Sequence, residues 1–174
     1  MALSGLLCAS TVHILSFFNV DVMQITPFVY LLHVGVLIVL FSVSINLRNS
    51  PEYRAHRQSG FFKSMNPATT YTIIFRQTPA WLSAIVMVGF VYAFLGCILF
   101  IFNEDGIAGI KNGHYVLQDG GDIIKTVTEA EYHRHRVIEM RGFSGCWIAF
   151  YGFAIAMLYP LVVNNVSQAK NLKS

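Results

Sequence analysis

The sequence predicts an all-α membrane protein. We expect a bundle of four transmembrane helices, and at least three, with a small extracytoplasmic cap made of a β-hairpin and a helix. Hydrophobic residues make up 55% of the 174 positions and charged residues only 12%, whereas a soluble domain carries about a quarter charged residues. A soluble chain of this size could not cover so much apolar surface, but lipid as solvent removes that problem. Residues 1–174 are therefore expected to form a single transmembrane domain.

Three long stretches contain no Asp, Glu, Lys or Arg. They are residues 27–47, 80–102 and 142–163. Each reaches the roughly 20 residues that a helix needs to cross about 30 Å of hydrocarbon. These stretches predict three transmembrane helices.

Residues 2–20 form a fourth apolar run, which several polar side chains dilute. It could be a spanning helix, an interfacial helix or a signal peptide. A signal peptide normally begins with a basic segment, and no Lys or Arg precedes Arg48. We therefore expect a fourth span, paired with the run at 27–47 through the short link at 21–26.

The distribution of charge predicts the orientation of the chain. The connection at 48–79 carries five basic residues and one acid, and the C-terminal tail carries only bases. Basic flanks stay on the cytoplasmic side of a membrane, which places both termini there and the connection at 103–141 outside. Four residues of the inner connection form a membrane-surface basic group: Arg48, Arg54, Arg57 and Lys63. This group either contacts anionic lipid headgroups or only fixes the topology.

The connection at 103–141 is too long to be a simple turn. Its two β-prone stretches, 114–118 and 122–127, flank the turn signal Asp119-Gly120-Gly121 and predict a hairpin. Asn112-Gly113 is a second turn signal just before the hairpin. We therefore expect an ordered cap outside the membrane.

The cap is expected to end in a helix over 129–140. Thr128 and Glu131 have the spacing of a capping box. On this helix, Glu131, His133 and His135 are candidate metal ligands, although a helix turns His133 and His135 away from each other. The alternative is a solvated face of ion pairs.

Small residues recur at helical spacing in the last two apolar runs. They are Gly142, Gly145, Ala149, Gly152 and Ala156 in the fourth run, and Gly89 and Ala93 in the third. Small side chains let helix backbones approach closely in lipid. These faces pack either against one another within the bundle or against a partner subunit.

His13 and His33 are candidate ligands of a b-type haem. Each lies six residues from the proposed end of its helix, Asn19 for His13 and Pro27 for His33, which is a depth of about 9 Å. Haem iron accepts histidine nitrogen, and a polar group at depth in a membrane suggests a function. The alternative is that each imidazole makes local hydrogen bonds, with Ser10, Ser16 or Tyr30, and stabilises the helix pair.

These patterns favour a non-enzymatic function. The apolar runs contain no charged residue of the kind that coupled transport needs, and no phosphate-binding, dinucleotide-binding or hydrolase motif occurs. We expect an accessory or partner-binding subunit, whose partners are the lipid bilayer and other membrane subunits or a second copy. A b-type cytochrome is one alternative. A membrane enzyme or carrier acting on lipid-like or neutral substrates is another. The basic residues are too sparse for nucleic acid.

Overall fold

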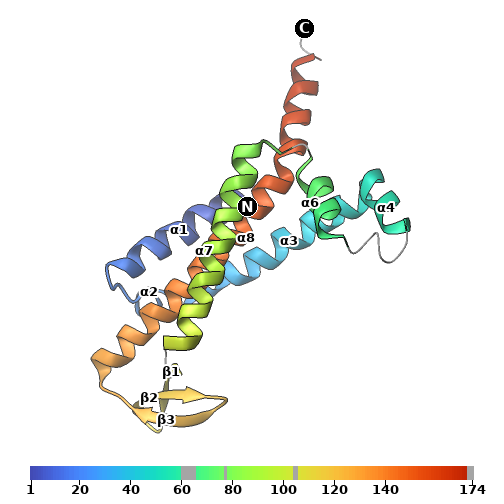
Figure 1. Cartoon of the computed structure of the whole chain (residues 1–174). Helices are drawn as coiled ribbons and strands as arrows, with labels where there is room; N and C mark the ends of the chain where they lie inside the picture. The colour runs from blue at the N-terminus through green and yellow to red at the C-terminus, as the bar shows by residue number, and fades with distance from the viewer. Residues whose placement is uncertain (60–65, 77, 104–105, 172–174) are drawn as a thin grey trace.

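The computed structural model describes residues 1–59, 66–76, 78–103 and 106–171, and these form a mostly helical structure with one small sheet (Figure 1). The long helix α8 (Glu129–Asn171) is the common packing partner of the other long helices. These helices are α1 (Ala2–Phe17), α3 (Leu31–Asn49) and α7 (Ala80–Asn103). α1 and α7 make the most extensive contacts with α8.

Among the described residues, three helices are long and apolar enough to cross a membrane. They cover Pro27–Asn49, Ala80–Phe100 and Glu129–Pro160. Each contains most of one of the three uncharged stretches, and the third also includes the charged segment 129–141 before its stretch. The first apolar run forms α1, which has 16 residues and therefore spans about 24 Å. That is less than the thickness of the hydrocarbon layer, so the fourth span stays a prediction.

α1 ends at Phe17, three residues before the end of the apolar run, because Asn19 adopts a left-handed conformation with φ of 56°. Asparagine tolerates this conformation at a helix end. The Asp21 carboxylate then accepts hydrogen bonds from the backbone N–H groups of Met23 and Gln24 and caps the short helix α2 (Val22–Ile25). The 3-10 turn η1 (Pro27–Tyr30) leads directly into α3.

The main apolar core lies where α1, α3 and α8 meet. Its buried members include Ala9 and Val12 of α1, Val36, Val39 and Val43 of α3, and Met140, Trp147, Tyr151 and Ala154 of α8. Tyr151 reaches into α3, where its hydroxyl donates to the Leu32 carbonyl at 2.9 Å. A Cβ atom at Gly5 or Gly35 would overlap the Tyr151 side chain, so glycine at both positions makes room for this tyrosine.

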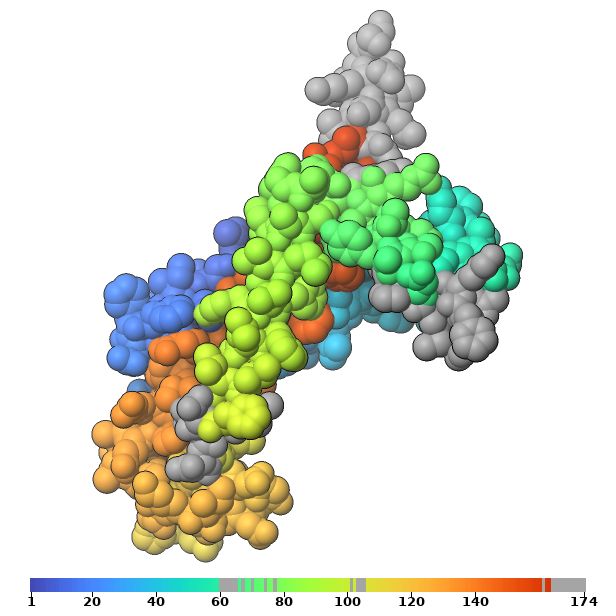
Figure 2. Space-filling view, viewed as in Figure 1, coloured from blue at the N-terminus to red at the C-terminus, as the bar shows by residue number. Residues whose placement is uncertain are grey.

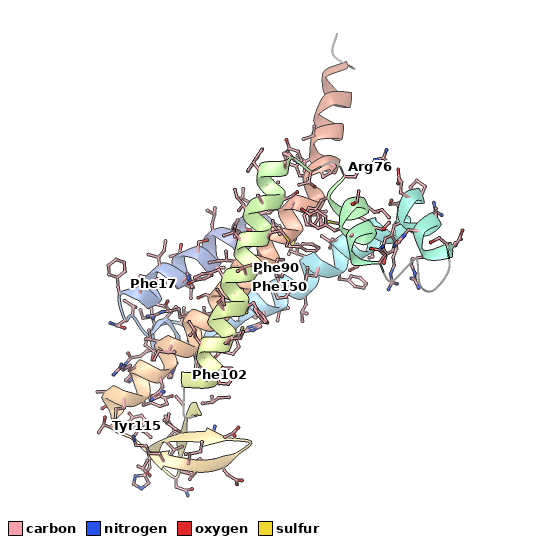
Figure 3. The ribbon with its side chains drawn as sticks, in the orientation of Figure 1. Phe17, Arg76, Phe90, Phe102, Tyr115 and Phe150 are labelled. Atoms are coloured by element: carbon pink, nitrogen blue, oxygen red, sulfur yellow. The ribbon has the colours of Figure 1, made fainter. Side chains whose placement is uncertain are left out.

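α7 packs on a different side of α8, as the crossing ribbons show (Figure 1). Phe90 of α7 and Phe150 of α8 meet edge to face, with ring centroids 5.5 Å apart (Figure 3). At the start of α7, the Thr78 hydroxyl donates to the Ala156 carbonyl at 2.9 Å. Both contacts hold α7 close to the α8 backbone.

The cap is a three-stranded antiparallel sheet in the order β1-β2-β3. Its strands are β1 (Ile107–Lys111), β2 (His114–Asp119) and β3 (Asp122–Thr126). β2 and β3 confirm the predicted hairpin, with positive φ at Gly120 and Gly121 in its turn. β1 is a strand that the sequence analysis did not predict. It joins β2 through the turn at Asn112 and Gly113, where both residues have positive φ.

The predicted capping box is confirmed at the start of α8. The Glu131 carboxylate accepts from the Thr128 backbone N–H at 2.8 Å, and the Thr128 hydroxyl accepts from the Glu131 N–H at 3.3 Å. Tyr115 of β2 donates its hydroxyl to the Glu129 carboxylate at 3.1 Å, and this bond raises the pKa of Tyr115. The sheet is thereby attached to the first turn of the helix.

Two short helices, α4 (Pro51–Gln58) and α6 (Pro67–Phe75), lie at the opposite end from the sheet, near the C-terminal half of α8 (Figure 1). Ser50 caps α4 and Asn66 caps α6. A proline follows each cap at the first position of the helix, where its missing N–H costs nothing. The described parts of the connection between α3 and α7 are therefore mostly helical.

Replacing Gly35 by alanine is expected to lower the free energy of unfolding by about 1–3 kcal/mol, the usual cost of overfilling a packed site. The added methyl group would overlap the Tyr151 hydroxyl. Gly152→Ala is the matched control, since a Cβ atom there meets nothing within 4 Å. Thermal unfolding in detergent micelles measures both variants. If the two have the same Tm, Tyr151 does not pack against α3 in this way.

Candidate functional site

A buried polar cluster joins α1, α7 and α8. At its centre, His13 of α1 places Nδ1 at 2.8 Å from the Ser144 hydroxyl of α8 and Nε2 at 2.7 Å from the Tyr92 hydroxyl of α7. His13 and Ser144 are both buried. Three segments far apart in the sequence therefore meet at one imidazole ring.

The hydrogen bonds of Ser144 assign the protons of this cluster. Ser144 donates its hydroxyl to the Met140 carbonyl at 2.7 Å, so it accepts from Nδ1–H of His13. In a neutral imidazole, Nε2 is the acceptor and the Tyr92 hydroxyl donates to it. Each ring nitrogen of His13 is thereby used within the protein.

Arg141 of α8 binds the C-terminal end of α1. Its Nη2 donates to the Ser16 carbonyl at 2.6 Å and its Nε to the Ser16 hydroxyl at 3.4 Å. The guanidinium carbon lies 4.7 Å from the centre of the Phe17 ring. A cation at the C-terminus of a helix is favoured by the helix dipole and by the free carbonyl groups there. Arg141 therefore fixes the end of α1 on α8.

A groove of about 530 Å³ opens beside this cluster, between α7 and α8. Its lining includes Ala93, Gly96 and Leu99 of α7 and Arg141, Gly142 and Gly145 of α8. In the space-filling view, α7 crosses in front of α8 with α1 beside it (Figure 2). Most of the lining is apolar, and Arg141 is its charged member.

His33, the second candidate haem ligand, lies among aromatic rings. It stacks on Tyr30 with centroids 5.9 Å apart and meets Phe143 and Trp147 of α8 edge-on, at 5.2 and 4.9 Å. Within the described part of the chain, His33 and His13 share no hydrogen bond or ring contact. To bind haem iron, His13 would have to give up one of its two hydrogen bonds. The pair therefore does not form a ready axial site.

The candidate metal ligands Glu131, His133 and His135 are not gathered around one point. Glu131 caps α8, and His133 Nδ1 lies 2.7 Å from the Asp21 carboxylate. Among the described residues, no group of three or more His, Cys, Asp or Glu side chains could hold a metal ion. The proposal of a metal site at these residues gains no support from this geometry.

Asp21 is a structural residue that the sequence analysis missed. Its buried carboxylate caps α2. It also pairs with His133 and with Nε of Arg136, which lies at 3.3 Å. The sequence signal was present, because an aspartate directly before a short helix is a typical cap. Its partners lie more than a hundred residues away and carry no local signal.

The small-residue faces are used partly within the chain. A Cβ atom at Gly145 would lie 3.5 Å from Tyr92 and 3.8 Å from His13, and one at Gly89 would lie 3.9 Å from the Ala149 backbone. Ala93, Ala149 and Ala156 are buried. At Gly142 and Gly152, in contrast, an added Cβ would meet nothing within 4 Å.

The basic group lies on and around α4. Arg48, Arg54 and Arg57 line one surface pocket of about 410 Å³, whereas Lys63 lies outside the described residues. The nearby Glu52 pairs with Arg76 at 3.7 Å. Hydrogen bonds from its own backbone N–H and from the Ser50 hydroxyl lower the pKa of Glu52. A contact of these arginines with anionic lipid headgroups stays a prediction.

Comparison with known proteins gives no relative: no family model matches the chain, and no curated protein or solved structure matches it either.

Tyr92 and His13 are expected to be energetically coupled. In a double-mutant cycle of Tyr92→Phe and His13→Leu, we expect a coupling of about 0.6 kcal/mol and at most ~1.7 kcal/mol, the range for hydrogen bonds between membrane helices. Unfolding in detergent micelles measures each variant. Tyr159→Phe combined with His13→Leu serves as the control, because Tyr159 makes no bond to His13. Additive effects of Tyr92→Phe and His13→Leu would contradict the hydrogen bond.

Proposed function

We propose that this chain is a multi-pass integral membrane protein and acts as a non-enzymatic accessory subunit. Its four apolar helices lie in the bilayer with both termini in the cytoplasm, and its sheet binds a partner outside. The sheet is the observation that carries this proposal. Ile107, Ile110, Ile123 and Ile124 are each half exposed or more, and all five residues of the edge strand β3 are exposed.

The pairing of the strands gives these isoleucines an ordered arrangement. Ile107 and Ile123 both pair with Gln118, from opposite sides of β2, so the two lie on one face of the sheet. Leu117 lies on the other face, where it packs with Tyr132 of α8. The sheet is therefore fixed to α8 through one face, and Ile107 and Ile123 are exposed on the other, beside the buried Val116.

An exposed edge strand can pair with a strand from another chain. Since β1 follows α7 closely and α8 begins just after β3, the sheet stands near the ends of two apolar helices. A protein anchored in the same membrane would be well placed to reach the sheet. We therefore propose an extramembrane segment of another membrane protein as the occupant of β3.

The placement of polar groups supports the proposed sidedness. Asp21, in the link between α1 and α3, meets His133 near the sheet, so this link and the cap lie at one end of the molecule. The basic group around α4 lies at the other end (Figure 1). Basic segments stay on the cytoplasmic side, which favours an extracytoplasmic cap.

The partner proposal predicts a specific cross-link. A photoreactive residue at Thr126 of β3, which pairs with Val116 on the face of Ile123, is activated in native membranes and is expected to give one discrete adduct with another membrane protein. Ile123→Lys should weaken the adduct about tenfold, corresponding to about 1.4 kcal/mol. Ile110→Lys is the control, because Ile110 is similarly exposed but lies on β1 and on the opposite face. Loss of the adduct in both variants, or in neither, contradicts binding at β3. An adduct with a second copy of the chain points to self-association instead.

An absorption spectrum tests the b-type cytochrome alternative. Because both nitrogens of His13 are already bonded, we expect no Soret band in the absorption spectrum of protein purified from haem-replete cells. A Soret band that disappears in the His33→Ala variant would overturn this expectation and favour an electron-transfer function.

A further inference from the structure

We propose that the groove between α7 and α8 binds one amphiphile, with its anionic head group on Arg141 and its apolar tail along the open positions at Gly96 and Gly142. The inference rests on the juxtaposition of an apolar groove and an arginine that has no acidic partner among the described residues. It requires only that the helices lie in lipid, and it is independent of a protein partner at the sheet.

Arg141 differs from Arg136 and Arg76 in its partners. Arg136 pairs with Asp21 and Arg76 pairs with Glu52. Within the described residues, no carboxylate lies within ion-pair distance of Arg141. Its partners are a carbonyl, a hydroxyl and an aromatic ring.

A guanidinium carries five N–H groups, and the bonds to Ser16 use only two of them. The remaining donors and the full positive charge are available beside the groove. A cation at the boundary of an apolar medium is strongly stabilised by an anion, because water screens the pair less there than in solution. Carboxylate and phosphate oxygens match the planar donor fork of arginine.

The groove has the size and lining for an alkyl tail. Its volume of about 530 Å³ lies within the range of small-molecule sites. Added Cβ atoms at Gly96 and Gly142 would meet nothing within 4 Å, so the space above both residues is open. Leu95 and Leu99 line the groove and are more than half exposed, which leaves it open to the surrounding lipid. A ligand could therefore enter from the bilayer.

Two kinds of molecule share this chemistry: a free fatty acid and an anionic phospholipid. The test uses spin-labelled stearic acid, its methyl ester, phosphatidylglycerol and phosphatidylcholine, each added to phosphatidylcholine vesicles that contain the protein. Electron paramagnetic resonance measures the motionally restricted fraction of each label. We expect stearate, phosphatidylglycerol or both to associate about tenfold more strongly than the uncharged and zwitterionic labels. The label that shows this preference identifies the source of the head group.

The variants separate this groove from other surfaces. Arg141→Gln removes the charge, and Gly96→Leu fills the groove while leaving the charge of Arg141 in place, so each should abolish the tenfold preference. Gly152→Leu is the matched control, because Gly152 is equally open but does not line the groove. If Arg141→Gln fails to fold, Gly96→Leu alone still decides the question. A second control, Arg54→Gln with Arg57→Gln, removes charge at the other end of the molecule and should leave the preference unchanged.

Two outcomes would overturn the proposal. The first is equal association of all four labels with the wild-type protein. The second is a preference that survives Gly96→Leu, or one that is lost only when Arg54 and Arg57 are replaced. Neither outcome bears on a protein partner at β3, so the two proposals can fail separately.

Discussion

The two hydrogen bonds of His13 are the constraint on which the arrangement of the helices depends. In an apolar medium a polar side chain finds no water, and leaving it unpaired is costly. The His13 imidazole is hydrogen-bonded to Tyr92 on α7 and to Ser144 on α8. Each bond fixes the distance and the relative rotation of α1 and the helix that it contacts. Apolar packing alone tolerates sliding and rotation more readily. The histidine thus gives three helices a single register.

Ion pairs play the corresponding role at the sheet end of the molecule. The buried Asp21 carboxylate is shared between the α2 cap, His133 and Arg136. Glu139 of α8 accepts from the backbone N–H of Ala108 in β1 at 2.6 Å. Removing one partner of such a buried pair is far more costly than the pair is worth in net stability. These contacts tie the link between α1 and α3, the sheet and α8 into one unit.

Features set by local sequence were predictable, and features set by distant contacts were not. The apolar helices, the hairpin and the capping box at Thr128 follow from composition and short-range spacing. The end of α1 was predicted too late, because Asn19 terminates the helix inside an apolar run. β1 was missed because its residues show little alternation. Symmetry about the link suggested that His13 and His33 face each other, but side-chain direction depends on helix rotation, which a single sequence does not reveal.

The length of α8 has a mechanical consequence. Its 43 residues form one continuous helix, a rod of about 65 Å, roughly twice the hydrocarbon thickness. A continuous helix passes a tilt imposed at one end along its length. Pro160 removes one backbone hydrogen bond within α8 and is a position where the helix can bend. A load on the sheet would thus be transmitted along α8 as far as Pro160.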